Sequence, residues 1–145
     1  MIVQTAYFGE LEIDESQIIH FEHGIPGFEE EKQFILQSIE EDSGFQVLQS
    51  VQTPELSFVV LNPYSVVIGY SFDLEESTVH ALQLQEEKDV SVLAIVTLKE
   101  TLAQSTVNLK APIIVNTKNN LAKQVILNDD AYAIRHPLFL ESKKG

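Results

Sequence analysis

The amino-acid sequence predicts a mainly β protein: a small closed or nearly closed antiparallel β-barrel-like domain with one or two short helices. Two observations predict this class. Roughly ten short apolar or alternating segments are separated by turn residues every 8–12 positions or so, a spacing typical of small all-β barrels. Only residues 73–85 carry apolar residues at helical spacing. Strands should therefore build most of the core.

The 145-residue chain is long enough to bury a core, and it contains no cysteine. We therefore expect one domain over residues 1–140 that folds without disulfides, followed by a frayed tail at residues 141–145. There is no run long enough to span a membrane and no signal-peptide pattern, so the cytoplasm is the expected compartment.

The segments before the helical stretch are short, apolar or alternating, and bounded by turn residues. They predict two strands within 2–12 around a turn near Gly9, and then strands at 18–21, 34–38, 45–51, 57–61 and 66–72. The strands at 34–38 and 45–51 flank an acidic turn at 40–44, which predicts a hairpin. The strand predicted at 57–61 ends at Asn62-Pro63, and the strand at 66–72 is expected to be half exposed.

The second half contains the helical stretch and the most apolar strand. In residues 73–85, one face can hold Leu74, Thr78, Val79, Ala81 and Leu82, with Asp73 or Ser77 as the cap. Residues 90–98 are nearly all apolar and β-branched, which is typical of a central strand buried on both faces. Further strands are expected at 107–116, where Pro112 indicates an edge or a bulge, and at 121–127.

The strongest turn signal is the sequence Gly24–Phe28. Pro26 restricts its own φ, and Gly27 can take the positive φ that a type II turn requires. An aromatic residue stands on each side of the turn, Phe21 before it and Phe28 after it. We expect the two rings to hold both arms of the turn against one core.

Charge is distributed unevenly along the chain. The net charge is −13, with 17 acidic residues and one basic residue, Lys32, in residues 1–87, against 5 acidic and 8 basic residues in 88–145. Such a protein should repel nucleic acid and anionic membranes and attract a basic partner. An acidic surface that serves only solubility is the alternative.

The acidic residues expected to face a basic partner lie beside the turn and beside the helical stretch. They are Glu29, Glu30, Glu31, Asp73, Glu75, Glu76, Glu86 and Glu87. The first three are expected in the first turn of a short solvent-facing helix, where acidic side chains interact favourably with unpaired backbone N–H groups.

Motifs for catalysis, metals or cofactors are not found. On a strand, the spacing of His20 and His23 places the two rings on opposite faces, and no carboxylate-rich ligand pattern surrounds them. The letters of Gly24–Gly27 match the phosphate-gripping loop of RNA-binding KH domains, but glutamates flank them here. No phosphate loop, nucleophile elbow or dinucleotide fingerprint is present. A small hydrolase that uses a surface carboxylate pair remains an alternative, although the chain has no Trp to stack on a sugar. The pairs Asp129-Asp130 and Arg135-His136 are interpreted as surface charges.

Five segments occur in a fixed order. They are Phe21 with GIPGF at 24–28, FVVLNP at 58–63, VLAIV at 92–96, TVNLKAPIIVN at 106–116, and KQVIL at 123–127 followed by Tyr132. Each is weak alone, but the ordered set is specific. On these residues the chain resembles the flagellar assembly factor FliW family from residue 1 to about residue 140.

The resemblance implies a small β-barrel-like fold, no catalysis and no cofactor. It implies two protein partners, flagellin and the carbon storage regulator CsrA, a small RNA-binding dimer that represses flagellin translation. In the family the two compete, and factor freed by flagellin export binds CsrA and lifts repression.

We expect a monomer that contacts neither nucleic acid nor membrane, in which Phe21, Gly24, Pro26, Gly27 and Phe28 are structural. Asn108 and Asn116 would supply side-chain hydrogen bonds where Pro112 interrupts the strands. Direct RNA binding is opposed by the charge.

Overall fold

The computed structural model describes residues 1–39, 44–128 and 131–138. The strands are β1 (Ile2–Thr5), β2 (Gly9–Glu12), β3 (Ile19–Phe21), β4 (Gln33–Ser38), β5 (Phe45–Ser50), β6 (Ser57–Leu61), β7 (Val90–Thr97), β8 (Thr106–Val107), β9 (Ile113–Asn116), β10 (Leu121–Gln124) and β11 (His136–Pro137). The helices in these ranges are α1 (Glu76–Ala81) and the 3-10 turns η1 (Glu15–Gln17), η2 (Pro63–Ser65), η3 (Glu87–Asp89) and η4 (Leu102–Gln104). Most of the predicted acidic turn at 40–44, the pair Asp129-Asp130 and the predicted tail at 141–145 lie outside the described residues.

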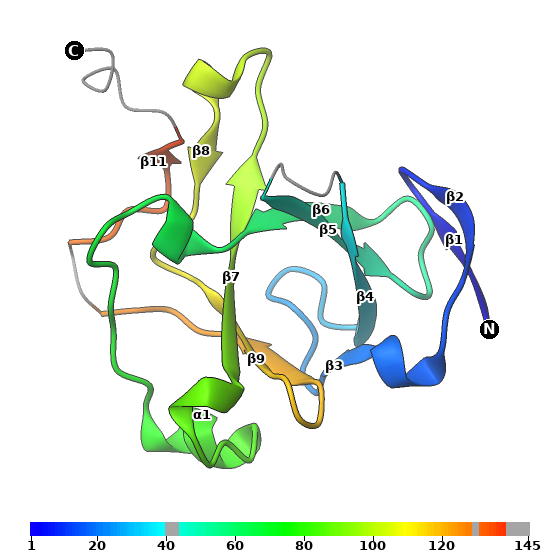
Figure 1. Ribbon diagram of the computed structural model, residues 1–145, viewed down its shortest axis with the longest axis horizontal. Helices are drawn as coiled ribbons and strands as arrows, with labels where there is room; N and C mark the ends of the chain where they lie inside the picture. The colour runs from blue at the N-terminus through cyan, green and yellow to red at the C-terminus, as the bar shows by residue number, and fades with distance from the viewer. Residues whose placement is uncertain (40–43, 129–130, 139–145) are drawn as a thin grey trace.

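Seven strands close into a barrel, in the order β7, β6, β5, β4, β3, β10, β9 and back to β7 (Figure 1). The ring closes through antiparallel pairing of β7 with β9, in which Val92 faces Ile114. The pairing of β3 with β10 is parallel, whereas the other pairings of the ring are antiparallel. The predicted closed β-barrel is confirmed, with one parallel pairing that the sequence pattern does not reveal.

The apolar strand predicted at 90–98 is β7, and it occupies the centre of the sheet. One edge pairs with β6, while the other pairs first with β9 and then with β8. Along that second edge, Val96 pairs with Val107 and Leu93 pairs with Ile113. The partner segment from Val107 to Ile113 is therefore longer than the β7 segment that it faces. The extra residues form a loop that ends at Pro112, directly before β9. The single strand predicted at 107–116 is therefore two strands, and the predicted interruption near Pro112 is confirmed.

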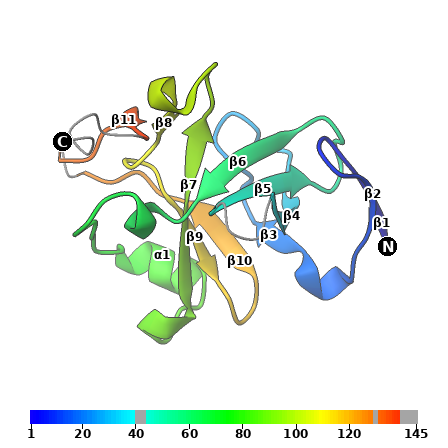
Figure 2. The same ribbon diagram turned by 45° about the horizontal axis from the view of Figure 1, so that its top comes forward.

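The barrel interior is filled by large side chains from facing strands. Phe21, Phe34, Leu48, Val60 and Ile113 are completely buried in one cluster. A separate cluster under the β1–β2 hairpin holds that hairpin against the barrel. Figure 2 shows the hairpin on the opposite side of the molecule from α1.

The half-exposed strand predicted at 66–72 is wrong. After β6, Pro63 begins η2, and the Asn62 side chain accepts a hydrogen bond from the Tyr64 N–H at 2.9 Å. The chain then turns at Gly69, whose φ is +84°, and continues as a loop towards α1. The residues of this segment have strand propensity, but their side chains pack inward without a strand. Tyr70 belongs to a buried cluster, and Phe72 packs against it.

The predicted helix exists but is shorter than 73–85. It covers Glu76–Ala81, and its N-cap is Glu75, whose side chain makes no capping bond, so Asp73 and Ser77 are not the cap. Thr78 and Leu82 are buried as expected, whereas Ala81 is exposed. No helix within the described residues has the length and apolar character needed to cross a membrane.

Candidate functional site

The predicted turn at Gly24–Phe28 is present. The Phe28 N–H donates to the Ile25 carbonyl at 2.6 Å, and Gly27 has a φ of +88°, as a type II turn requires. Ile25 is 2% exposed and belongs to the barrel-core cluster. The loop is seen within the ring of strands in Figure 1, so this turn contributes directly to the barrel interior.

Four phenylalanine rings connect the two arms of the turn to the barrel. Phe21 contacts Phe34 edge-on at 5.3 Å between ring centroids, and Phe34 lies 6.2 Å from Phe58. Phe28 completes the series, with its ring 5.5 Å from that of Phe58. Phe21 is completely buried in the barrel core, whereas Phe28 is 41% exposed and contacts the core through Phe58. The expectation that both rings hold the turn against one core is confirmed for Phe21 and only in part for Phe28.

The three glutamates after the turn do not form a helix, which corrects the prediction. Their backbone continues the turn, and the Glu29 carboxylate accepts from the Gly27 N–H at 3.1 Å. Glu31 is half buried and accepts hydrogen bonds from Ser50 Oγ at 2.5 Å and Thr53 Oγ1 at 2.6 Å. Glu30 remains an exposed acidic side chain. Glu31 therefore connects the loop to the β5–β6 turn and is not the freely exposed acidic residue that was expected.

The second group of predicted site residues lies around α1. Asp73 is in the loop before the helix, Glu75 and Glu76 are at its start, and Glu86 and Glu87 are at and beside η3. All five side chains are exposed. Lys88, also exposed, makes an ion pair with Glu86 at 3.3 Å. The fold therefore gathers residues separated by up to 14 positions in sequence at one end of the molecule (Figure 1).

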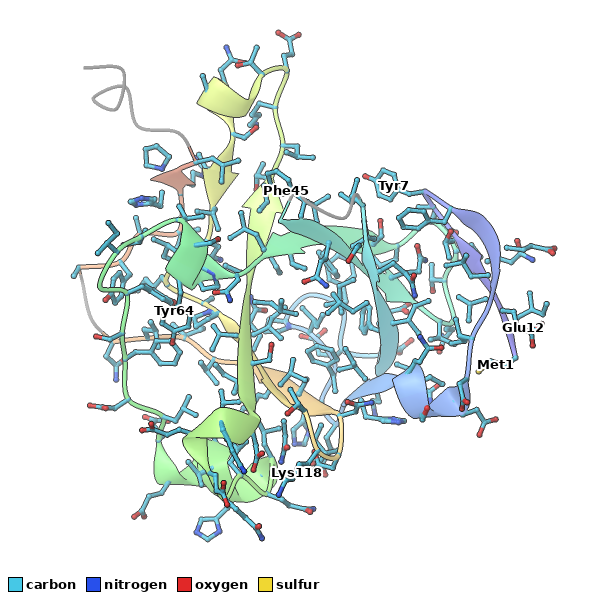
Figure 3. The ribbon with its side chains drawn as sticks, viewed as in Figure 1. Met1, Tyr7, Glu12, Phe45, Tyr64 and Lys118 are labelled. Atoms are coloured by element: carbon cyan, nitrogen blue, oxygen red, sulfur yellow. The ribbon has the colours of Figure 1, made fainter. Side chains whose placement is uncertain are left out.

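Two grooves flank the loop at Phe72–Leu74. The α1–β10 groove, about 580 Å³, lies between this loop and residues 123–128 and includes Asp73, Glu75 and Lys123. The η2–β7 groove, about 700 Å³, lies between the same loop and the first half of β7. Its lining residues are Asn62, Tyr64, Phe72, Asp73, Leu74, Val79, Glu87, Val90, Ser91 and Val92. Figure 3 shows Tyr64 beside β7 on this side.

Two aromatic side chains, one buried and one half buried, hold the loop between these grooves. Tyr70 is 2% exposed, and its hydroxyl donates to the Leu109 carbonyl at 2.7 Å. The Tyr132 ring lies 4.6 Å from that of Tyr70, and its hydroxyl bonds to both the N–H and the carbonyl of Ser71. Burial, with smaller contributions from Tyr64 and Tyr132, raises the pKa of Tyr70 far above its ordinary value. Tyr70 is therefore a neutral donor that fixes the loop.

The two asparagines that the FliW resemblance makes structural both form side-chain hydrogen bonds. Asn108 Oδ1 accepts from the N–H groups of Lys110 and Ala111, at 3.1 and 3.0 Å, within the loop that ends at Pro112. Asn116 is 2% exposed, and its Nδ2 donates to the carbonyls of Leu82 and Gln83. Asn116 therefore joins β9 to the end of α1, and only Asn108 has the expected role beside the interruption at Pro112.

A buried acidic residue that the sequence reading missed supports the same region. Asp89 is 5% exposed, and Lys118 Nζ lies 3.7 Å from its Oδ2. Its carbonyl accepts from both the N–H and the hydroxyl of Thr117. Asp89 thus ties η3 to the β9–β10 turn and does not belong to the exposed acidic group.

The remaining candidates in the described part of the chain do not gather into a metal site. Among the described residues, no three His, Asp or Glu side chains are grouped to hold a metal ion. His20 lies in β3 and His23 in the turn that follows, and both are exposed. The groove residues Phe72 and Val90 were not singled out from the sequence, because only the folded loop brings them together.

Comparison with known proteins assigns the family. The sequence profile of the family described as "FliW protein" matches residues 2–138. The chain is 50% identical over 142 residues to the flagellar assembly factor FliW of Bacillus subtilis (strain 168), covering 98% of this chain and 99% of that protein. It is 43% identical over 141 residues to the protein of the same name from Clostridium botulinum (strain Okra / Type B1), covering 97% and 99%.

A solved structure agrees. The chain superposes on a crystal structure of the flagellar assembly factor FliW with a TM-score of 0.91 and 43% sequence identity, over 97% of this chain and 99% of that chain. The order of motifs in the sequence, the closed seven-strand barrel and the full-length similarity agree with one another. This chain belongs to the FliW family.

Proposed function

We propose that this protein is a non-catalytic cytoplasmic regulator that binds CsrA and relieves repression of flagellin synthesis, with flagellin as the competing partner. Membership of the FliW family supports a role in flagellar assembly. The observation that carries the proposal is the exposed acidic group around α1: Asp73, Glu75, Glu76, Glu86 and Glu87. A basic RNA-binding partner is attracted to such a surface, whereas RNA is repelled by it.

Electrostatics supply part of the mechanism in this proposal. RNA binding by a basic protein depends on Lys and Arg side chains that neutralise phosphates. A protein of net charge −13 that docks beside the RNA groove lowers the local potential and competes with the phosphates for the same cations. The regulator can therefore release RNA without filling the groove itself.

The alternatives have less support. Glycosidase-type hydrolysis needs one carboxylic acid kept protonated near neutral pH, usually by burial, whereas Asp73, Glu75 and Glu87 in the two grooves are exposed. Direct RNA binding requires a basic surface, and the η2–β7 groove carries two acidic side chains instead.

Size-exclusion chromatography with purified partners tests the proposal. We expect co-elution with CsrA alone and with flagellin alone, and no complex that contains all three proteins. Added protein should also lower the fluorescence anisotropy of a labelled RNA bound to CsrA. A stable ternary complex would contradict competition, and failure to bind either partner would overturn the proposal.

A further inference from the structure

We propose that the η2–β7 groove is the docking site for a segment of a protein partner that carries an apolar side chain flanked by lysine or arginine. The inference deepens the proposed function and rests on it, because it names the surface that would hold the basic partner. Its basis is the combination of an apolar floor with an acidic rim.

The floor of the groove is apolar and half buried. Phe72, Leu74 and Val90 line it and also pack against a buried cluster of Leu82, Val92 and Ile114. Their exposed parts would leave water if an apolar side chain entered. Burial of one such side chain is worth about 1.5–3 kcal/mol, enough to anchor a short segment.

The rim of the groove is acidic. Asp73 lies on the loop side and Glu87 at the start of η3, and both side chains are exposed. Among the described residues that line this groove, none is basic. The neighbouring α1–β10 groove instead contains Lys123. Charge complementarity therefore favours a cationic segment in the η2–β7 groove.

The wall of the groove is held in place before any partner arrives. Tyr64 is 48% exposed, its ring packs edge-on against Tyr70 at 5.5 Å, and its N–H is bonded to Asn62. The Tyr70 hydroxyl is fixed on the Leu109 carbonyl. A wall with few degrees of freedom to lose makes docking less costly in entropy.

Two kinds of variant test the groove, with CsrA as the probe. Asp73→Lys/Glu87→Lys reverses the rim, and Val79→Trp fills the groove without a change of charge, because Val79 lines it on α1 and is half buried. We expect each to raise the dissociation constant by about tenfold or more, mainly through faster dissociation. Circular dichroism and thermal melts establish that each variant is folded.

Matched controls separate docking from overall charge and from local change. Glu10→Lys/Glu12→Lys changes the net charge by the same amount on β2, on the opposite side of the molecule from the groove (Figures 2 and 3). Val79→Ala alters the same position without filling the groove. We expect both controls to bind CsrA within about threefold of the wild type.

The outcomes distinguish the two proposals. If the wild type binds CsrA and Val79→Trp binds equally well, the groove is not the docking site and the proposed function stands. An equal loss in Glu10→Lys/Glu12→Lys and Asp73→Lys/Glu87→Lys also overturns the groove assignment, because charge then acts without regard to position. If the wild type binds neither CsrA nor flagellin, the proposed function is overturned and the inference with it.

Discussion

At the scale of single residues, the Gly24–Phe28 turn requires two glycines for different reasons. Gly27 has a φ of +88° with open space where a Cβ would stand, so only its backbone conformation demands glycine. Gly24 has a φ of +70°, and a Cβ there would lie 2.5 Å from the Glu29 carbonyl oxygen. Gly24 is therefore constrained by both conformation and contact.

The two positions should respond differently to alanine. We expect Gly27→Ala to lower the free energy of unfolding by roughly 1–2 kcal/mol through backbone strain. Gly24→Ala should cost clearly more, because the loop must also move away from the new methyl group. Thermal melts of the two variants measure the difference, and coincident curves would contradict this account of Gly24.

The carboxylate of Glu31 should couple energetically to Thr53. Glu31→Ala removes the acceptor for the hydroxyls of Ser50 and Thr53, and we expect a loss of about 1–3 kcal/mol of unfolding free energy. In a double-mutant cycle, Thr53→Val should cost little once Glu31 is absent. Additive losses in urea denaturation would show that this contact contributes no stability.

At the scale of elements, the residue that follows the C-cap of α1 has an unfavourable backbone conformation. Gln83 has a φ of +57°, and the Leu84 N–H donates to the Val79 carbonyl, which is the hydrogen-bond pattern of a glycine-type helix end. Gln83→Gly should therefore raise the free energy of unfolding by up to about 1 kcal/mol. The carbonyl that accepts from Asn116 is unaffected, because it belongs to the backbone.

A matched substitution controls for glycine itself. Asn120 also has a positive φ, +61°, but asparagine tolerates this region and its Nδ2 donates to the Ser16 carbonyl at 2.7 Å. Asn120→Gly should therefore give no gain in melting temperature. A gain there equal to that of Gln83→Gly would argue against relief of strain at the end of α1.

The two asparagines next to the β7 edge should differ in importance. Asn116→Ala removes the buried donor to the carbonyls of Leu82 and Gln83, of which Leu82 keeps only the longer bond from Asn119 Nδ2 at 3.4 Å, and we expect a loss of about 2–3 kcal/mol. Asn108 is half buried and supports only the local loop, so Asn108→Ala should cost about 1 kcal/mol. Denaturant unfolding gives both values, and the reverse order would contradict the role of Asn116 as the link between β9 and α1.

Elements with strong local signals were predictable from the sequence, and elements set by distant contacts were not. Alternation and turn residues located the β4–β5 hairpin and β7 closely. Residues 66–72 have strand propensity, yet Tyr70 packs on Leu109 and the segment remains a loop. The glutamates after the Gly24–Phe28 turn are not helical because Glu31 bonds to residues 19 and 22 positions away. The exposure of the five acidic residues around α1 was therefore predictable, but the groove that Asp73 and Glu87 border was not. That these residues bind a partner stays a prediction.

At the scale of the whole molecule, the charge should act mainly on the rate of association. Exposed charges on the rim of an interface steer a partner at long range, whereas side chains buried at its centre control dissociation. Glu75, Glu76 and Glu86 are exposed and do not line the η2–β7 groove. Charge reversal at these three positions can therefore test steering of a partner separately from docking in the groove.

Reversal of these three residues to Lys should slow association with CsrA while leaving the dissociation rate within about twofold of the wild type. Association of the wild type should slow steeply as salt rises, since exposed charges are screened beyond about 8–10 Å at physiological ionic strength. The reversed variant should have a shallower salt dependence, and single changes to Gln should be nearly silent. Stopped-flow rates at two salt concentrations measure both effects. Equal salt slopes for the wild type and the reversed variant would mean that the acidic surface around α1 serves solubility and does not steer the partner.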